Sequence, residues 1–168
     1  MTIKFDANKP LGELLQKWWE DLQDRNGDRA ELHRAETVTD VILLPAFQRA
    51  CLRFKPYFQH EENWEERLAA ILGLLSHIRQ LGEKKLALDM ASPNILKNEP
   101  PVVSELRFRR LIQRDRADLY VSMIRVLRML DNKANLHDLA YSVYFWGDNV
   151  KRRWAFDYFP NTPEKTST

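Results

Sequence analysis

The sequence predicts an all-α fold, a two-lobed helical bundle of about eight helices. Hydrophobic residues make up 44% of the 168-residue chain and aromatic residues 11%, which suffices for a sizeable core. Only five glycines interrupt the chain. Apolar and charged residues alternate over long stretches with the 3.6-residue period of a helix, whereas runs of β-branched residues are scarce.

The helices expected in the N-terminal half follow from apolar stripes and from helix-breaking residues. Leucines and tryptophans form one stripe over residues 11–22, and Asn26-Gly27 is expected to break that helix. Asp28 is a candidate N-cap for a short helix that follows. Pro45 is expected at a bend, where it ends one helical turn and begins the next helix.

The strongest helical pattern covers residues 64–78, and Gly82 suits its C-terminal stop. The helix dipole favours negative charge near a helix start, so the glutamates there are expected to be capping residues: Glu61, Glu62, Glu65 and Glu66. Residues 83–104 contain two proline interruptions and no long period. This segment is expected to connect the two halves, with one helical turn near Leu86–Ala91.

Four helices are expected after the connecting segment. Ser104, Asp115 and Asn135 can cap the first three, with Asp138 at the N3 position of the third. The fourth helix follows Gly147 with little or no loop.

The two halves differ in charge. Residues 1–98 carry 14 basic and 15 acidic side chains, whereas residues 105–153 carry 11 basic and 6 acidic ones. We therefore expect an N-terminal helical lobe with a connecting segment (1–98), a basic C-terminal helical lobe (99–160) and a disordered tail (161–168). A basic region on a protein of net charge +2 indicates a directed anionic partner: nucleic acid, a polyanionic metabolite or an acidic protein surface.

Signals for secretion, membrane insertion and catalysis are missing from the sequence. Cys51 is the only cysteine, the first residues lack a signal peptide's apolar core, and the longest apolar runs are too short to span a bilayer. A soluble, cytoplasmic chain without a membrane partner is expected. The histidines stand apart, the glycines form no phosphate loop and no nucleophile motif is present, so we expect no enzyme activity, catalytic residue, metal site or cofactor.

Arginine is preferred over lysine, with sixteen arginines against ten lysines. At 100° per residue, Arg107, Arg110 and Arg114 fall within about 60° of one another on one helix. Guanidinium groups bind phosphate bidentately and stack on exposed bases, so such helices can line a groove for a nucleic-acid backbone. The other candidates from this pattern lie on the second and the fourth of the helices expected after the connecting segment: Arg125, Arg128, Lys151, Arg152 and Arg153.

Structural roles compete with this interpretation. In the competing interpretation, the arginines lie on solvated helix faces and pair with local aspartates. Arg116 lies on the apolar side of its helix beside Asp115, so a buried or interlobe ion pair is expected for it. The segment "YSVYFWGDNVKRRWAFDYF" interleaves aromatic and basic residues as base-stacking surfaces do. Five of its residues nevertheless keep helical core spacing and are expected to pack inside: Val143, Trp146, Val150, Trp154 and Tyr158.

Three segments together resemble a known family. "GDRAELHRAETVTDVILLPAF" is similar to its N-terminal signature, a short basic helix followed by a P-A-F turn. "ELRFRRLIQRDRADLYVSMIRVLRML" is similar to its arginine-rich central signature, and "YFWGDNVKRRWAFDYF" to its closing aromatic-Trp-Gly and basic helix. The family is CasB, the small subunit of the type I-E CRISPR surveillance complex Cascade. The resemblance covers nearly the whole chain, with the three segments in the same order and spacing.

The resemblance implies a two-lobed, all-α, non-catalytic protein in antiviral defence. Its implied partners are the Cascade backbone and large subunits, a second copy of itself, the guide RNA and the target DNA, whose displaced strand it would stabilise. Such a strand offers phosphates and unstacked bases without a fixed sequence. By position, Arg34 falls in the N-terminal signature, Arg107 at the start of the central one and Arg125 on the following helix. After Gly147, where family members often carry a basic residue, this chain has an Asp-Asn pair instead.

Two other functions fit the sequence. An autonomous helical adaptor would bind acidic protein partners and keep them after nuclease treatment. A small helical enzyme of the chorismate-mutase kind would hold a dianionic substrate with arginines in a buried pocket. A nucleic-acid clamp requires an open basic surface, so the exposure of the arginines separates the clamp from the enzyme.

Overall fold

The structure, a computed structural model, describes residues 2–92 and 100–162 and confirms the all-α prediction. Two-residue strands β1 (Gln80–Leu81) and β2 (Lys133–Ala134) pair in parallel, and a 3₁₀ turn, η2 (Phe159–Asn161), follows the last helix. The helices within these ranges are α1 (Pro10–Gln23), α2 (Asn26–Arg34), α3 (Val38–Ile42), α4 (Pro45–Phe58), α5 (Trp64–Leu75), α6 (Leu86–Ala91), α7 (Glu105–Ile112), α8 (Arg116–Met129), α9 (Leu136–Tyr144) and α10 (Asp148–Tyr158).

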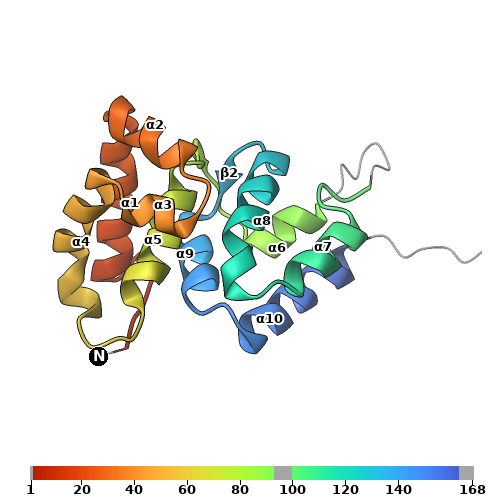
Figure 1. The fold of residues 1–168 in the computed structure, drawn as a ribbon. Coiled ribbons are helices and arrows are strands. Elements are labelled where there is room, and N and C mark those ends of the chain that lie inside the picture. Colours follow the sequence, from red (N-terminus) through yellow and green to blue (C-terminus); the bar gives the residue numbers. More distant parts are fainter. Residues whose placement is uncertain (1, 93–99, 163–168) are drawn as a thin grey trace, which may run out of the picture.

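The helices gather in two groups with α9 between them (Figure 1). Helices α1 to α5 form one group, and α6, α7, α8 and α10 form the other. Although α6 precedes residue 98, it packs against α10 and η2, and one cluster of buried side chains runs through both groups. The lobe boundaries at residues 98 and 160 stay predictions. The tail expected to be disordered lies outside the described residues from residue 163 onward.

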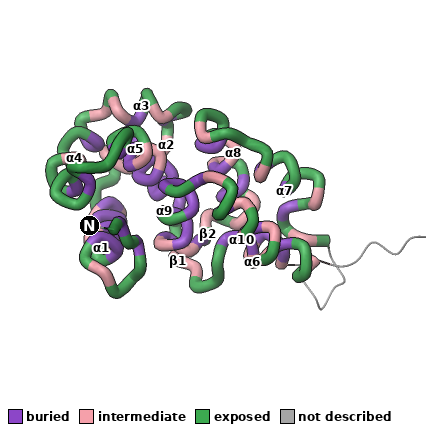
Figure 2. The backbone as a smooth tube through the Cα atoms, turned by 90° about the horizontal axis from the view of Figure 1, so that it is seen from below, coloured by how far each residue is buried: buried purple, intermediate pink, exposed green. Residues whose placement is uncertain are grey.

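Helix α5 is the element on which helices from both groups and α9 pack. Its residues from Leu68 to Leu75 are buried except for the half-buried Ala70. It contacts α3 and α9 most extensively, and also α2, α4 and α8. Gly73 permits the contact with α8, because a Cβ at that position would lie 2.5 Å from the Tyr120 hydroxyl oxygen. Figure 2 shows the buried backbone concentrated along α5, α9 and the inner face of α1.

The expected helix starts are largely confirmed. Ser104, Asp115 and Asn135 each accept a hydrogen bond from the backbone N–H three residues later, at 3.3, 3.0 and 3.0 Å. Pro45 begins α4, where its missing N–H costs no helical hydrogen bond. The helical turn expected in the connecting segment is α6.

Two expected helix boundaries are wrong. Asn26 and Gly27 are the first two residues of α2, so Asp28 lies inside the helix and its carboxylate instead accepts a hydrogen bond from Arg49 at 3.2 Å. The strongest helix ends at Leu75 and not near residue 78, because the chain turns there into β1, which pairs with β2. Gly82 therefore follows the strand and does not end the helix.

Asp138 connects three helices through its buried carboxylate. The residue is 8% exposed. It accepts a hydrogen bond from the backbone N–H of Leu86 at 2.8 Å, and it forms an ion pair with Arg153 of α10. The Asp138 carboxylate of α9 thus accepts a hydrogen bond from the first residue of α6 and balances the charge of Arg153 on α10.

Replacing this carboxylate should destabilise the fold. The variant Asp138→Ala leaves a buried N–H without an acceptor and a half-buried guanidinium without its carboxylate, so the free energy of unfolding should fall by about 2 to 4 kcal/mol. Urea denaturation measures the change. As a matched control, Asp28→Ala removes a pair whose arginine side chain is 60% exposed and should cost at most about 1 kcal/mol. Equal losses in the two variants would contradict the role assigned to Asp138.

Candidate nucleic-acid interface

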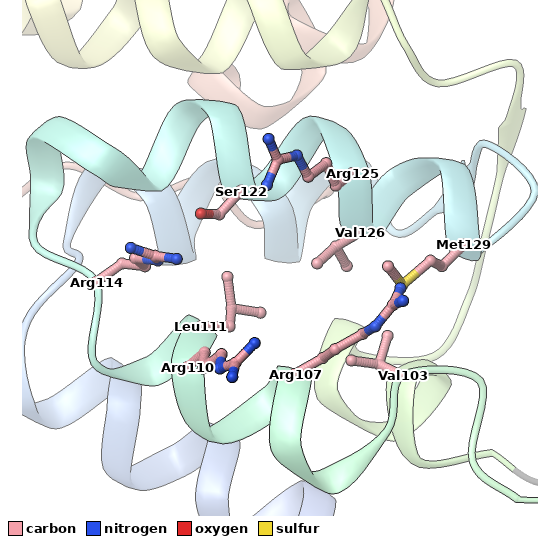
Figure 3. Close-up of a pocket in the computed structure, with 9 residues that line it drawn as sticks. All are labelled: Val103, Arg107, Arg110, Leu111, Arg114, Ser122, Arg125, Val126 and Met129. Carbon is pink, nitrogen blue, oxygen red and sulfur yellow. The ribbon is translucent and has the colours of Figure 1, made fainter.

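Four arginines surround a hollow of about 320 Å³ between α7 and α8, here called the arginine hollow. Figure 3 shows Arg107 and Arg110 on α7, Arg114 on the turn that follows and Arg125 on α8, at the rim of this hollow. All four are exposed, and their charged ends surround an apolar floor. The other residues that line the hollow are Val103, Leu111, Ser122, Val126 and Met129.

The packing of α7 fixes the direction of these arginines. Phe108 and Leu111 are the buried residues of the helix, and the Phe108 ring stacks on Tyr158 of α10 at 3.8 Å between ring centroids. Because the apolar side of α7 faces α10, residues on its other side face α8 and solvent. The structure therefore brings together the three arginines that helical geometry grouped, and adds Arg125 to them.

The arginines of the hollow have no carboxylate partners within residues 2–92 and 100–162. None of the four forms an ion pair with a described residue. Glu105, the acidic residue on α7, instead pairs with Arg109 at 2.8 Å, and Asp115 caps α8. Among the described residues these arginines therefore do not pair with local acids, and their role in nucleic-acid binding stays a prediction. Uncompensated like charges around one hollow favour the binding of an anion.

Two further hollows continue from the arginine hollow. The histidine hollow, of about 650 Å³, lies between α8 and the end of α2 and is lined by His33, Arg34, Ala35, Glu36, Thr37, His77, Val121, Ile124, Arg125 and Arg128. The outer hollow, of about 230 Å³, is lined by Asn26, Arg29, Ala30, His33, Arg34 and Arg79.

Shared residues join the three hollows into one surface, here called the basic face. Arg125 lines both the arginine and the histidine hollows, and His33 and Arg34 line both the histidine and the outer hollows. Eight arginines line the basic face, whereas Glu36 is the one acidic residue among its lining residues. An extended, open and strongly basic face suits an extended polyanion better than a small enclosed substrate.

The third predicted basic group lies elsewhere. Arg153 donates hydrogen bonds to Asp138 and Ser142 inside the fold. The Lys151 ammonium lies 5.5 Å from the centre of the Trp146 ring, and Arg152 is exposed. None of Lys151, Arg152 and Arg153 lines the basic face.

Arg116 forms hydrogen bonds and no ion pair with any residue that the structure describes, which corrects the expected role. Its guanidinium donates to the backbone carbonyls of Val143, Tyr144 and Trp146 at 2.8, 2.9 and 3.3 Å. It therefore satisfies carbonyl groups at the C-terminal end of α9, where a cation also interacts favourably with the helix dipole. Burial, with a smaller contribution from the nearby charge of Arg67, lowers the pKa of Arg116.

The aromatic segment behaves as its spacing predicts. Its five residues at core spacing are all buried: Val143, Trp146, Val150, Trp154 and Tyr158. In the described parts of the chain no group of three or more His, Cys, Asp or Glu side chains could hold a metal ion. None of the helices there combines the length and apolarity that a membrane crossing requires.

Sequence reasoning predicted Arg34 of α2 but missed Arg29 and Arg79, which also line the basic face. Arg79 follows α5 and meets Arg29 and Arg34 only because α2 packs on α5. No local pattern marks this meeting, since the residues lie about fifty positions apart. Spacing along one helix could identify Arg107, Arg110 and Arg114, but not partners from another helix.

An all-helical fold with an open, arginine-lined face has the charge and shape that suit an extended anion. The comparisons with known proteins make the assignment specific. The chain belongs to the CRISPR-associated protein Cse2 family, whose model matches residues 28–159. Cse2 is another name for CasB, so the resemblance seen in the sequence is confirmed. Membership also agrees with the expectation that the chain is not an enzyme.

Solved structures contain a chain of the same fold. A chain in the crystal structure of E. coli Cascade bound to a PAM-containing dsDNA target is similar with a TM-score of 0.66 and 20% sequence identity. The match covers 89% of this chain and 95% of that one. No curated protein matches this sequence significantly.

His77 is buried beneath the basic face and stays neutral there. It is 3% exposed. Burial, helped by the neighbouring His33 and Arg128, lowers its pKa from 6.5 to about 4. Between pH 6.5 and about pH 4, His77 is protonated in the unfolded chain but stays neutral in the folded chain. Stability linked to His77 is therefore fully present above pH 6.5 and is lost as the pH falls towards 4.

A variant without this titration should tolerate acid better. His77→Phe keeps a ring at the site but cannot be protonated. Between pH 7 and pH 4.5 its free energy of unfolding should fall by about 2 kcal/mol less than that of the wild type. Urea denaturation at several pH values measures the difference. The exposed His60→Phe should show the wild-type pH dependence, and the same dependence in His77→Phe would refute the assignment.

Proposed function

We propose that this chain is a non-catalytic small subunit of a type I-E CRISPR Cascade complex. Its basic face would act as a clamp that stabilises the R-loop formed when guide RNA pairs with target DNA, chiefly by holding the displaced non-target strand. The observation that carries the proposal is the row of eight arginines without ion-pair partners among the described residues. In such complexes base pairing reads the sequence, so a subunit that contacts only the backbone needs no sequence preference.

Membership in the Cse2 family supports this assignment, and so does a fold shared with a chain of a Cascade bound to dsDNA. The partners that follow are the Cascade backbone and large subunits, a second copy of this chain, the guide RNA and the target DNA. The cytoplasm, where such a complex meets its target DNA, is the proposed location.

The exposure of the arginines favours a clamp over an enzyme. Arg107, Arg110, Arg114 and Arg125 are all exposed around a hollow with an apolar floor. A chorismate-mutase-like site would enclose a small dianion among buried arginines. The described structure contains an open face instead, and a long single strand fits such a face by repeating phosphates along it.

The salt dependence of binding tests the clamp. Changing Arg107, Arg110 and Arg114 together to alanine should leave α7 intact, because alanine is a better helix former. Each phosphate contact contributes about −0.7 to the slope of log K against log salt for single strands, so this slope should flatten by roughly 2. The weakening should be alike for all sequences. In an assembled complex, the displaced strand should become more open to a single-strand nuclease while guide and target still pair.

A control with the same loss of charge separates the basic face from general electrostatics. Arg25, Arg53 and Lys55 are exposed and line none of its three hollows. Their triple alanine variant should keep a slope close to that of the wild type. Unchanged slope and unchanged nuclease protection in the first variant, with circular dichroism showing an intact fold, would exclude this part of the face from DNA binding. Binding of acidic proteins that survives nuclease treatment would favour the adaptor instead.

A further inference from the structure

Two histidine rings lie against each other where the histidine and outer hollows meet. His33 lies on α2 and His77 just after α5, and their ring centres are 4.2 Å apart with an angle of 36° between the planes. His77 is the inner ring, with 3% exposure, and its Nε2 atom has no hydrogen-bond partner in the described part of the chain. His33 is the outer, half-buried ring. The core therefore holds the inner ring, and the inner ring supports the outer one.

Arginines stand on both sides of the outer ring. His33 lines the outer hollow together with Arg29 and Arg79, and it lines the histidine hollow together with Arg128. Arg34 lines both. A single strand alternates planar bases with charged phosphates, and proteins that bind such strands combine aromatic rings with basic grooves. An imidazole ring between two groups of guanidiniums reproduces that alternation.

We propose that His33 is a stacking platform for one unpaired nucleobase of the bound strand, and that the arginines on either side hold the neighbouring phosphates. The proposal rests on the proposed function and names the part of the strand that this region binds. The base would enter the histidine hollow, whose volume of about 650 Å³ lies within the range of sites that enclose small ligands. Its apolar lining from Val121 and Ile124 suits the faces of a base.

The charge state of the ring fits this role. Burial lowers the pKa of His33, contact with the backbone of Ser76 opposes the shift, and the charges of Arg79, Arg29 and Arg128 lower it further. The imidazole is therefore neutral at pH 7.5. A neutral ring contributes by stacking and releases no counterion, so its contribution depends on the base and not on salt, unlike that of the arginines.

Removing the bases while keeping the phosphates tests the proposal in the wild-type protein. An abasic deoxyribose-phosphate strand and a poly-dT strand of equal length carry the same number of phosphates. The wild-type chain should bind the abasic strand about fivefold or more weakly, with a similar salt slope for both strands. Fluorescence anisotropy across a salt series measures both quantities. Equal affinity for the two strands would overturn the platform and leave the clamp standing, whereas binding of neither strand would overturn the nucleic-acid role itself.

Variants of His33 then test whether this ring causes the preference for the intact strand over the abasic one. His33→Ala should bind the intact and abasic strands almost equally, and His33→Phe should restore the preference, because phenylalanine retains an aromatic face. His60→Ala, which changes an exposed histidine outside both hollows, should keep the preference. A full preference for the intact strand in His33→Ala would place base stacking elsewhere and refute the assignment. Melting curves confirm that each variant is folded.

Discussion

Helix α5 must be covered on every side, and the arrangement of the other helices follows from this constraint. Seven of its eight residues from Leu68 to Leu75 are buried, so neither side of the helix can face water without a large loss of hydrophobic free energy. Helices from one half of the chain cannot surround it alone. Helix α8 approaches across Gly73, and α9 covers another side. The basic face exists because this packing brings α2 and α8 next to each other.

The arginines of this protein divide into two populations according to what surrounds them. Arg116 and Arg153 satisfy the carbonyl end of α9 and the carboxylate of Asp138, so their charges are used within the fold. Arg109 pairs with Glu105 on the same helix. The arginines of the basic face have no such partners among the described residues. Sequence position alone does not separate the two populations, since Arg109, Arg110, Arg114 and Arg116 lie within eight residues.

The parts of the fold that depend on local chemistry could be predicted from the sequence, and the parts that depend on distant contacts could not. The caps at Ser104, Asp115 and Asn135 follow from side chains that reach a backbone three residues away. The end of α5 depends on a strand more than fifty residues later, so periodicity placed it too far along. For the same reason helical spacing grouped Arg107 with Arg110 and Arg114, whereas the ring contact between His33 and His77 could not be predicted from the sequence.

The residues that line the histidine hollow lie far apart in the sequence. Ligand binding there is therefore coupled to folding. The hollow combines residues 33–37 with His77 and with residues 121–128, so it exists only while these three parts of the chain are packed together. A ligand that binds there binds the native state and not the unfolded chain. By mass action it must raise the unfolding free energy by RT ln(1 + [L]/Kd), about 2.7 kcal/mol at a ligand concentration one hundred times Kd. A chain that holds a strand across this face is thereby more resistant to unfolding than the same chain alone.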